Sequence, residues 1–259
     1  MDSSVIAFPG HPVGIASVSI DVDSASPAGY DQIQSVCVEL LERFNKRGIA
    51  ASWAIENPFG GTVIRQITAG RPGHEVALLA MSEQPVGADS RGQIIERIVR
   101  PLKKAVAAGI SISSIGVTGR WRPQHVDLLA KHGITVIRGS SRQAFRQRIE
   151  PICYGMWHVP VAVDIRGGGW MANHAQLRLA RRALGVAMRD GGLCHLRIDA
   201  AALAKGDAAC SLRTVDRLLR DVAQIRDAGQ IVIETLRGTA ARLAPKRVLP
   251  AARSILRAA

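Results

Sequence analysis

The sequence predicts an α/β fold, a distorted (β/α) barrel of seven or eight units. Short apolar runs rich in β-branched residues alternate with amphipathic helical patterns along most of the 259 residues. Several of the helical patterns end at a glycine that suits a helix C-cap. No G-x-G-x-x-G follows the first apolar run, so a dinucleotide-binding fold gains no support. Seven or eight units in about 240 residues favour a closed or nearly closed barrel.

Each element follows from its local pattern. The expected strands are residues 16–21, 50–55, 75–81, 111–117, 135–138, 157–165, 193–199 and 230–236. The expected helices are residues 31–47, 62–69, 91–108, 123–132, 174–189 and 212–228. Gly48, Gly109, Gly133 and Gly229 follow four of these helices. Because the C-terminal ends of barrel strands converge on one mouth, the polar residues there are the candidates for function.

Composition bounds the class of protein. Hydrophobic residues make up 47% and charged residues 21% of the chain, which argues for a sizeable core. No run approaches the ~18 apolar residues of a membrane helix. The N-terminus lacks the basic and apolar regions of a secretory signal, and four scattered cysteines without CxxC spacing are expected to be buried reduced thiols, which favours the cytoplasm. We expect a single domain over residues 1–243, followed by a basic tail over 244–259.

The positive charge is concentrated in the second half of the chain. Residues 131–259 hold 22 basic and 9 acidic residues, which accounts for the whole formal charge of +13. Such a surface attracts polyanions, although a basic solvated face without a partner has the same composition. The charge gathers in the tail and in one helical pattern, which carries Arg178, Arg181, Arg182 and Arg189.

Six segments occur in an order that resembles the polysaccharide deacetylase, or NodB-homology, family. "SIDVDS" resembles the first motif of that family, and "GHEVALL" resembles the lead-in to its second. "WRPQHVDLLAKHGITVIR" is similar to the arginine-proline motif, and "LCHLRIDAAAL" is similar to the final L-x-H segment. The segments 40–58 and 218–236 resemble the helix-strand pairs beside these motifs. The resemblance covers roughly residues 14–240 and implies the distorted barrel.

The resemblance also implies a chemistry. Active members hold a divalent metal ion that polarises an N-acetyl carbonyl and its bound water, while an Asp removes the proton and a His protonates the leaving amine. By this resemblance Asp21 is the base, Asp23 a metal ligand, His195 the acid and Arg122 the residue that steadies the base. Read from the residues alone, the two aspartates could equally cap a loop, and His195 could be a core histidine.

The second motif departs from the family pattern. Two metal-binding histidines are expected four residues apart, but "EVALLAMSE" places Leu79 and Glu83 at those positions. Leucine cannot bind a metal, and a site made of Asp23 and Glu83 suits magnesium or manganese better than zinc. We therefore expect a divalent metal to be absent or weakly bound.

Two function hypotheses remain open. The protein is either a hydrolase of N-acetyl groups on sugars or related amides, with weak or no conventional metal-dependent activity, or a non-catalytic relative that binds a glycan or a protein. Leu79 and Glu83 favour the second. Trp121 and Trp170 are candidate residues for stacking on a sugar ring, although core packing is the usual role of tryptophan.

Overall fold

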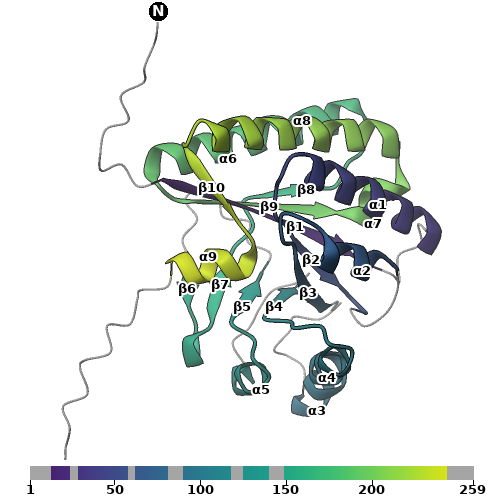
Figure 1. Ribbon diagram of the computed structural model, residues 1–259, viewed down its shortest axis with the longest axis vertical. Coiled ribbons are helices and arrows are strands. Elements are labelled where there is room, and N and C mark those ends of the chain that lie inside the picture. Colours follow the sequence, from purple (N-terminus) through teal and green to yellow (C-terminus); the bar gives the residue numbers. More distant parts are fainter. Residues whose placement is uncertain are drawn as a thin grey trace, which may run out of the picture.

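The computed structural model describes residues 13–23, 29–57, 62–80, 90–117, 125–139 and 149–243. Within these ranges a single curled sheet lies at the centre of the molecule and helices surround it (Figure 1). This architecture confirms the predicted α/β class and the barrel-like sheet.

The sheet runs in the order β6-β7-β5-β4-β3-β2-β1-β9-β8, with β10 paired to the first half of β1. All its pairings are parallel except that of β6 with β7. The strands are β1 Gly14–Val22, β2 Ser52–Ile55, β3 Glu75–Ala80, β4 Ser114–Val117, β5 Val136–Arg138, β6 Glu150–Pro151, β7 Trp157–Val159, β8 Val163–Ile165, β9 Leu193–Asp199 and β10 Ile231–Glu234. Their order is that of successive βα units, as the sequence predicts.

The single strand predicted over residues 157–165 was wrong. The chain forms two short strands there, β7 beside β5 and β8 beside β9, at opposite ends of the strand order. Pro160 divides them, because proline has no N–H to donate to a sheet ladder. Ala162 then donates its N–H to the carbonyl of His195 at 2.8 Å. The segment between β7 and β8 therefore crosses from one end of the curled sheet to the other.

Most of the predicted helices form, and the chain adds two that the sequence analysis missed, α7 and α9. α3, a π-helical turn η1 and α4 follow one another without a break where the sequence predicts one helix over 91–108. The helices are α1 Tyr30–Lys46, α2 Thr62–Ala69, α3 Arg91–Ile94, η1 Ile95–Val99, α4 Arg100–Ala107, α5 Val126–Lys131, α6 Trp170–Asp190, α7 Ala200–Lys205, α8 Ala208–Asp227 and α9 Leu236–Leu243, with a 3₁₀ turn η2 at Cys153–Gly155. Gly48 and Gly229 adopt φ of 60° and 71° after α1 and α8, as expected of C-cap glycines.

Alternation along the strands divides the side chains into two sets. In β1, Ala16, Val18 and Ile20 belong to the large core between sheet and helices. Ile15 belongs instead to a small cluster inside the curled sheet, where Leu236 and Ala240 of α9 cover one end. Since successive residues of a strand point to opposite faces, the inner face of β1 continues through Ser17 and Ser19 to Asp21. The first predicted site residue therefore faces the interior of the sheet.

Two further expectations concern the whole chain. None of the described helices is long and apolar enough to cross a bilayer. Cys37, Cys153, Cys194 and Cys210 are all free thiols, and the first and third of these are buried. The expectation that all four thiols are buried was wrong for Cys153, which is exposed, and for Cys210, which is partly exposed.

Candidate functional site

Asp21 lies at the centre of a buried ion-pair network inside the curled sheet. Both terminal nitrogens of Arg138 donate to its carboxylate, Nη1 to Oδ1 through a very short contact and Nη2 to Oδ2 at 2.9 Å. Arg197 Nε donates to Oδ2 at 2.7 Å. Asp21 and Arg138 are buried, as is most of Arg197. Each carboxylate oxygen of Asp21 is therefore engaged by a guanidinium.

Arg138 fits inside the sheet because the neighbouring strand carries no side chain at the contact. It ends β5 and has no exposed surface. Gly116 of β4 pairs with it, and a Cβ added to Gly116 would lie 2.5 Å from Arg138 Nη2 and 3.2 Å from Ala54 Cβ. Small residues on β2 and β4 thus leave the volume that the guanidinium fills.

Arg197 connects this network to the strand ends. Its Nη1 lies 3.1 Å from Oδ1 of Asp164, and its Nη2 lies 3.9 Å from Asp199. β9 places Arg197 and Asp199 two residues apart, and Asp199 pairs in register with Asp21. Two arginines thus face three carboxylates, and burial costs less when every charge has a partner of opposite sign.

The charges set the protonation state of Asp21. Burial alone would raise the pKa of this carboxyl, but the positive charges of Arg138 and Arg197 and their hydrogen bonds hold its pKa below the usual value. The same contacts raise the pKa of Arg197 against the opposing effect of its burial. At neutral pH the network therefore contains an ionised Asp21 and two guanidinium cations.

His195 is joined to the Asp21 network through Ser19 and Arg138. The imidazole is fully buried, with Nδ1 3.0 Å from the carbonyl oxygen of Pro160 and Nε2 2.9 Å from Ser19 Oγ. A carbonyl can only accept, so the proton lies on Nδ1 and Nε2 accepts from the Ser19 hydroxyl. Ser19 Oγ accepts in turn from Arg138 Nη1 at 3.1 Å. Burial, and then the charge of Arg138, lower the pKa of His195 to about 3.

Of the remaining predicted site residues, two can be placed and three lie outside the described residues. Asp23 is half-buried directly after β1. Trp170 is 72% exposed at the start of α6 on the outside of the sheet. Glu83, Trp121 and Arg122 lie outside the described residues. The roles carried over from the family resemblance to all these residues stay predictions.

The described residues do not fit a divalent metal ion. No group of three or more His, Cys, Asp or Glu with metal-binding geometry occurs among them. Leu79 packs inside the sheet against Ala54 and Ala77, so this position of β3 presents an apolar side chain. Asp21 offers both oxygens to arginines instead, and a guanidinium repels a second cation. We derive no step through a metal.

The sequence analysis missed Arg138 and Arg197, although both were visible. Each stands in a segment predicted as a strand, and Arg197 shares the face of His195 by the two-residue period. A charged residue in an apolar strand is rare unless it is paired, so each arginine implied a carboxylate partner. The sequence signal for this contact is Gly116, a glycine within a predicted strand. Its missing side chain leaves room inside the sheet for the guanidinium of Arg138, which reaches Asp21.

The curled parallel sheet, with its strand order and closing helix, is the fold of polysaccharide deacetylases and carbohydrate esterases of family 4 (CE4). A structure from Pseudomonas aeruginosa described as a probable polysaccharide deacetylase superposes with a TM-score of 0.65 at 14% identity, over 91% of this chain and 92% of that one. The allantoinase Puue gives a TM-score of 0.65 at 15% identity, over 91% of both chains.

A third similar structure is a CE4 family pseudoenzyme from Bacillus anthracis, with a TM-score of 0.53 at 13% identity. The superposition covers 89% of this chain and 66% of that one. No protein-family model matches the sequence, and no curated protein matches it. At these identities the comparisons establish the fold.

Proposed function

We propose that this protein is a non-catalytic relative of the deacetylases that binds a carbohydrate. The observation that carries the proposal is the engagement of both Asp21 oxygens by Arg138 and Arg197. A general base needs a free lone pair within reach of the proton it removes, and a pKa near the working pH. Asp21 meets these needs poorly, because three guanidinium N–H groups occupy most of its about four acceptor positions, the side chain is buried, and its pKa is lowered.

His195, the predicted general acid, is also unsuited to its role. His195 has a pKa of about 3, so at neutral pH its ring is uncharged, and its one proton, on Nδ1, is donated to the carbonyl of Pro160 while Nε2 accepts from Ser19. Arg138 fills the interior where a substrate or metal would otherwise meet Asp21. A CE4 family pseudoenzyme has the same fold, so this fold is compatible with a chain that has no activity.

An acetate-release assay tests the proposal. Purified protein is incubated with chitotetraose in the presence of zinc, manganese or magnesium, and acetate is measured. We expect release no greater than that of the Asp21→Asn and Asp23→Asn variants. Asp23 is only half-buried, so its variant remains informative if Asp21→Asn fails to fold. Metal-dependent acetate release that falls in Asp23→Asn would overturn the proposal.

We also propose that residues 1–243 form a single domain, that the protein is cytoplasmic, and that its basic half binds polyanions. Free thiols at all four cysteines support a reducing compartment. On α6, Arg181 is paired with Asp221 at 2.8 Å, whereas Arg178 and Arg189 are exposed and remain candidates together with the tail. The tail lies outside the described residues. Deletion of residues 244–259 should lower retention on heparin, and unchanged retention would leave the charge without a partner.

A further inference from the structure

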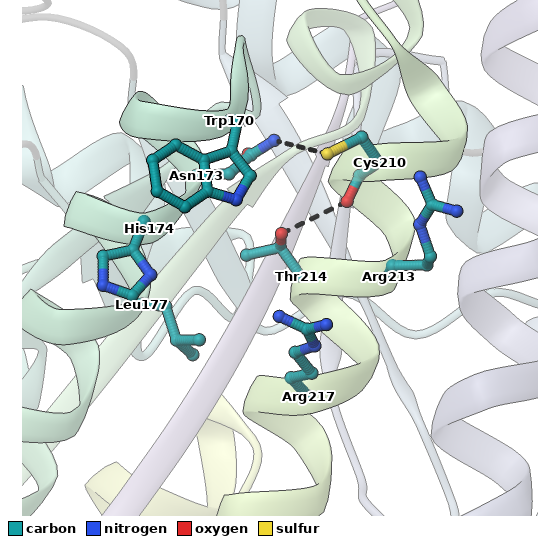
Figure 2. Close-up of a pocket in the computed structure, with 8 residues that line it drawn as sticks. All are labelled: Trp170, Asn173, His174, Leu177, Cys210, Arg213, Thr214 and Arg217. Atoms are coloured by element: carbon teal, nitrogen blue, oxygen red, sulfur yellow. Dashed lines mark hydrogen bonds between the residues drawn. The ribbon is translucent and has the colours of Figure 1, made fainter.

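A groove on the outer helical layer, between α6 and α8, has the features of a ligand site. Its cavity of about 170 Å³ is bounded by Trp170, Asn173, His174 and Leu177 from α6 and by Cys210, Arg213, Thr214 and Arg217 from α8 (Figure 2). Since a water molecule occupies about 30 Å³ in the liquid, this is room for five or six waters, well below the ~300 Å³ of a drug-sized site. The groove suits one ring-sized group.

Trp170 provides a flat apolar surface at this groove. The indole is 72% exposed and stacks on the imidazole of His174, with centroids 5.7 Å apart and planes 15° from parallel. One face is thus supported and the other is open to solvent. Met171, the next residue, is 78% exposed. A supported, exposed aromatic ring binds the C–H face of a sugar, because each presents apolar surface of similar size.

Asn173 adds an unpaired acceptor beneath the aromatic ring. Its side chain is 3% exposed, and Nδ2 donates to the carbonyl of Gly168 at 2.9 Å and contacts Cys210 Sγ at 3.6 Å. Oδ1 is buried without a hydrogen-bond partner. A buried polar atom without a partner is uncommon in folded proteins and is costly. Asn173 lines the cavity but Oδ1 itself has almost no accessible surface, so a hydroxyl group held there donates to Oδ1 once the amide rotates toward the cavity.

The opposite wall is cationic. Arg213 and Arg217 lie four residues apart on one face of α8, and both are exposed. Among the described residues neither forms an ion pair, whereas Arg220 on the next turn is held by Asp216 at 3.2 Å. No carboxylate lines the groove. Two guanidinium groups without a paired carboxylate favour an anion, which arginine can bind through two parallel hydrogen bonds.

We propose that the α6/α8 groove binds an anionic sugar: one ring stacked on Trp170, a hydroxyl donated to Asn173 Oδ1, and a carboxylate or phosphate held by Arg213 and Arg217. The sugar part of this inference rests on the proposed function. The groove lies outside the sheet and shares no residue with the Asp21 network. It thus gives the chain a binding site that does not need the sheet interior.

Calorimetric titration of the full chain tests this with digalacturonate, glucose 6-phosphate, di-N-acetylchitobiose and inorganic phosphate. We expect one of the two anionic sugars to bind at least tenfold more tightly than both the neutral sugar and phosphate, and which of the two does so identifies the anionic group. Trp170→Ala and Arg213→Ala should each weaken that binding about tenfold or more, that is by about 1.4 kcal/mol or more, because the first removes the stacking surface and the second a charged hydrogen-bond donor.

The matched control is Arg189→Ala, which removes the same charge from the last turn of α6. It should change the affinity less than twofold. Equal binding of phosphate alone, equal loss in the control, or no binding by either anionic sugar would overturn the proposal. Acetate release would overturn the proposed function while a bound anionic sugar upheld the groove, so the two failures are distinguishable.

Discussion

Arg138 and Gly116 are in direct contact across β5 and β4, and the guanidinium occupies the space of a missing side chain. A Cβ at Gly116 would lie 2.5 Å from Nη2 and 2.9 Å from Cζ of Arg138, closer than real Cβ atoms approach. The arginine is held by Asp21 and Ser19 as well, so it has little freedom to retreat. The pair therefore couples the packing of the sheet to its buried charge.

We predict that Gly116→Ala lowers the free energy of unfolding by about 1–3 kcal/mol, the usual cost of overpacking. Urea denaturation measures it. Gly185→Ala, in α6 with no atom within 4 Å of the added Cβ, is the control and should be neutral or stabilising by up to about 1 kcal/mol. In an Arg138→Lys background Gly116→Ala should cost less, because the guanidinium fork is gone. Strictly additive effects of the two substitutions would contradict the contact.

A second prediction concerns Asp21 itself. Asp21→Asn should destabilise the fold by about 3–5 kcal/mol, because it leaves two buried guanidinium groups short of a counter-charge. The control is Asp127→Asn, which breaks the exposed pair with Arg91 and should leave the denaturation midpoint almost unchanged. An Asp21→Asn protein as stable as the wild type would contradict this prediction. It would mean that the fold does not depend on the Asp21 carboxylate and that a catalytic role is open to it.

The sequence predicted the sheet better than it predicted the site. β9 and α2 have the predicted bounds, and β1 differs by two residues at its start and one at its end, because their apolar periodicity is set by burial on the outer face. The prediction of one strand over 157–165 was wrong because its apolar residues belong to two strands, β7 and β8, with different neighbours. Apolarity alone does not indicate which strand a segment will pair with. Pro160 was the visible warning.

The site was harder because it depends on pairs far apart in the chain. Asp21 is 117 residues from Arg138, and a motif read along the chain places it beside Asp23 rather than beside its partner. The family resemblance directed attention to residues that match a motif, whereas the interior is organised by residues that do not. Leu79 and Glu83 were recognised as departures from the second motif; Leu79 lies in an apolar cluster with Ala54 and Ala77, and Glu83 lies outside the described residues.

A third prediction concerns pH. The pKa of His195 is about 3 in the fold and 6.5 unperturbed, so the unfolded chain takes up this proton first as the pH falls. Stability from the neutral imidazole is therefore complete above about pH 6.5 and is lost as the pH falls toward 3, at up to about 1.4 kcal/mol per pH unit. Asp21 acts only below about pH 4, because its folded pKa lies under 3.8 and its contribution is present above that value.

The slope of unfolding free energy against pH, measured by denaturation between pH 4.5 and 7, reports on the buried histidines. The wild-type slope also contains His74, whose pKa burial lowers to about 4. His195→Gln should remove about one proton from the slope, a difference that accumulates to about 2 kcal/mol or more over this range. Identical slopes for wild type and His195→Gln would show that this ring is accessible to protons in the fold.

The last prediction concerns metal. A site that bound zinc with a Kd of about 1 μM would gain about 2.7 kcal/mol at 100 μM zinc, which for a chain of this size raises the melting temperature by several degrees. We expect a shift of less than about 1 °C with zinc, and none on adding a chelator, because Arg138 supplies the cation at Asp21 and Leu79 supplies no ligand. The Asp23→Ala variant separates specific from adventitious binding. A zinc-dependent rise that disappears in Asp23→Ala would require ligands beyond the described residues and would restore the metal-dependent hydrolase.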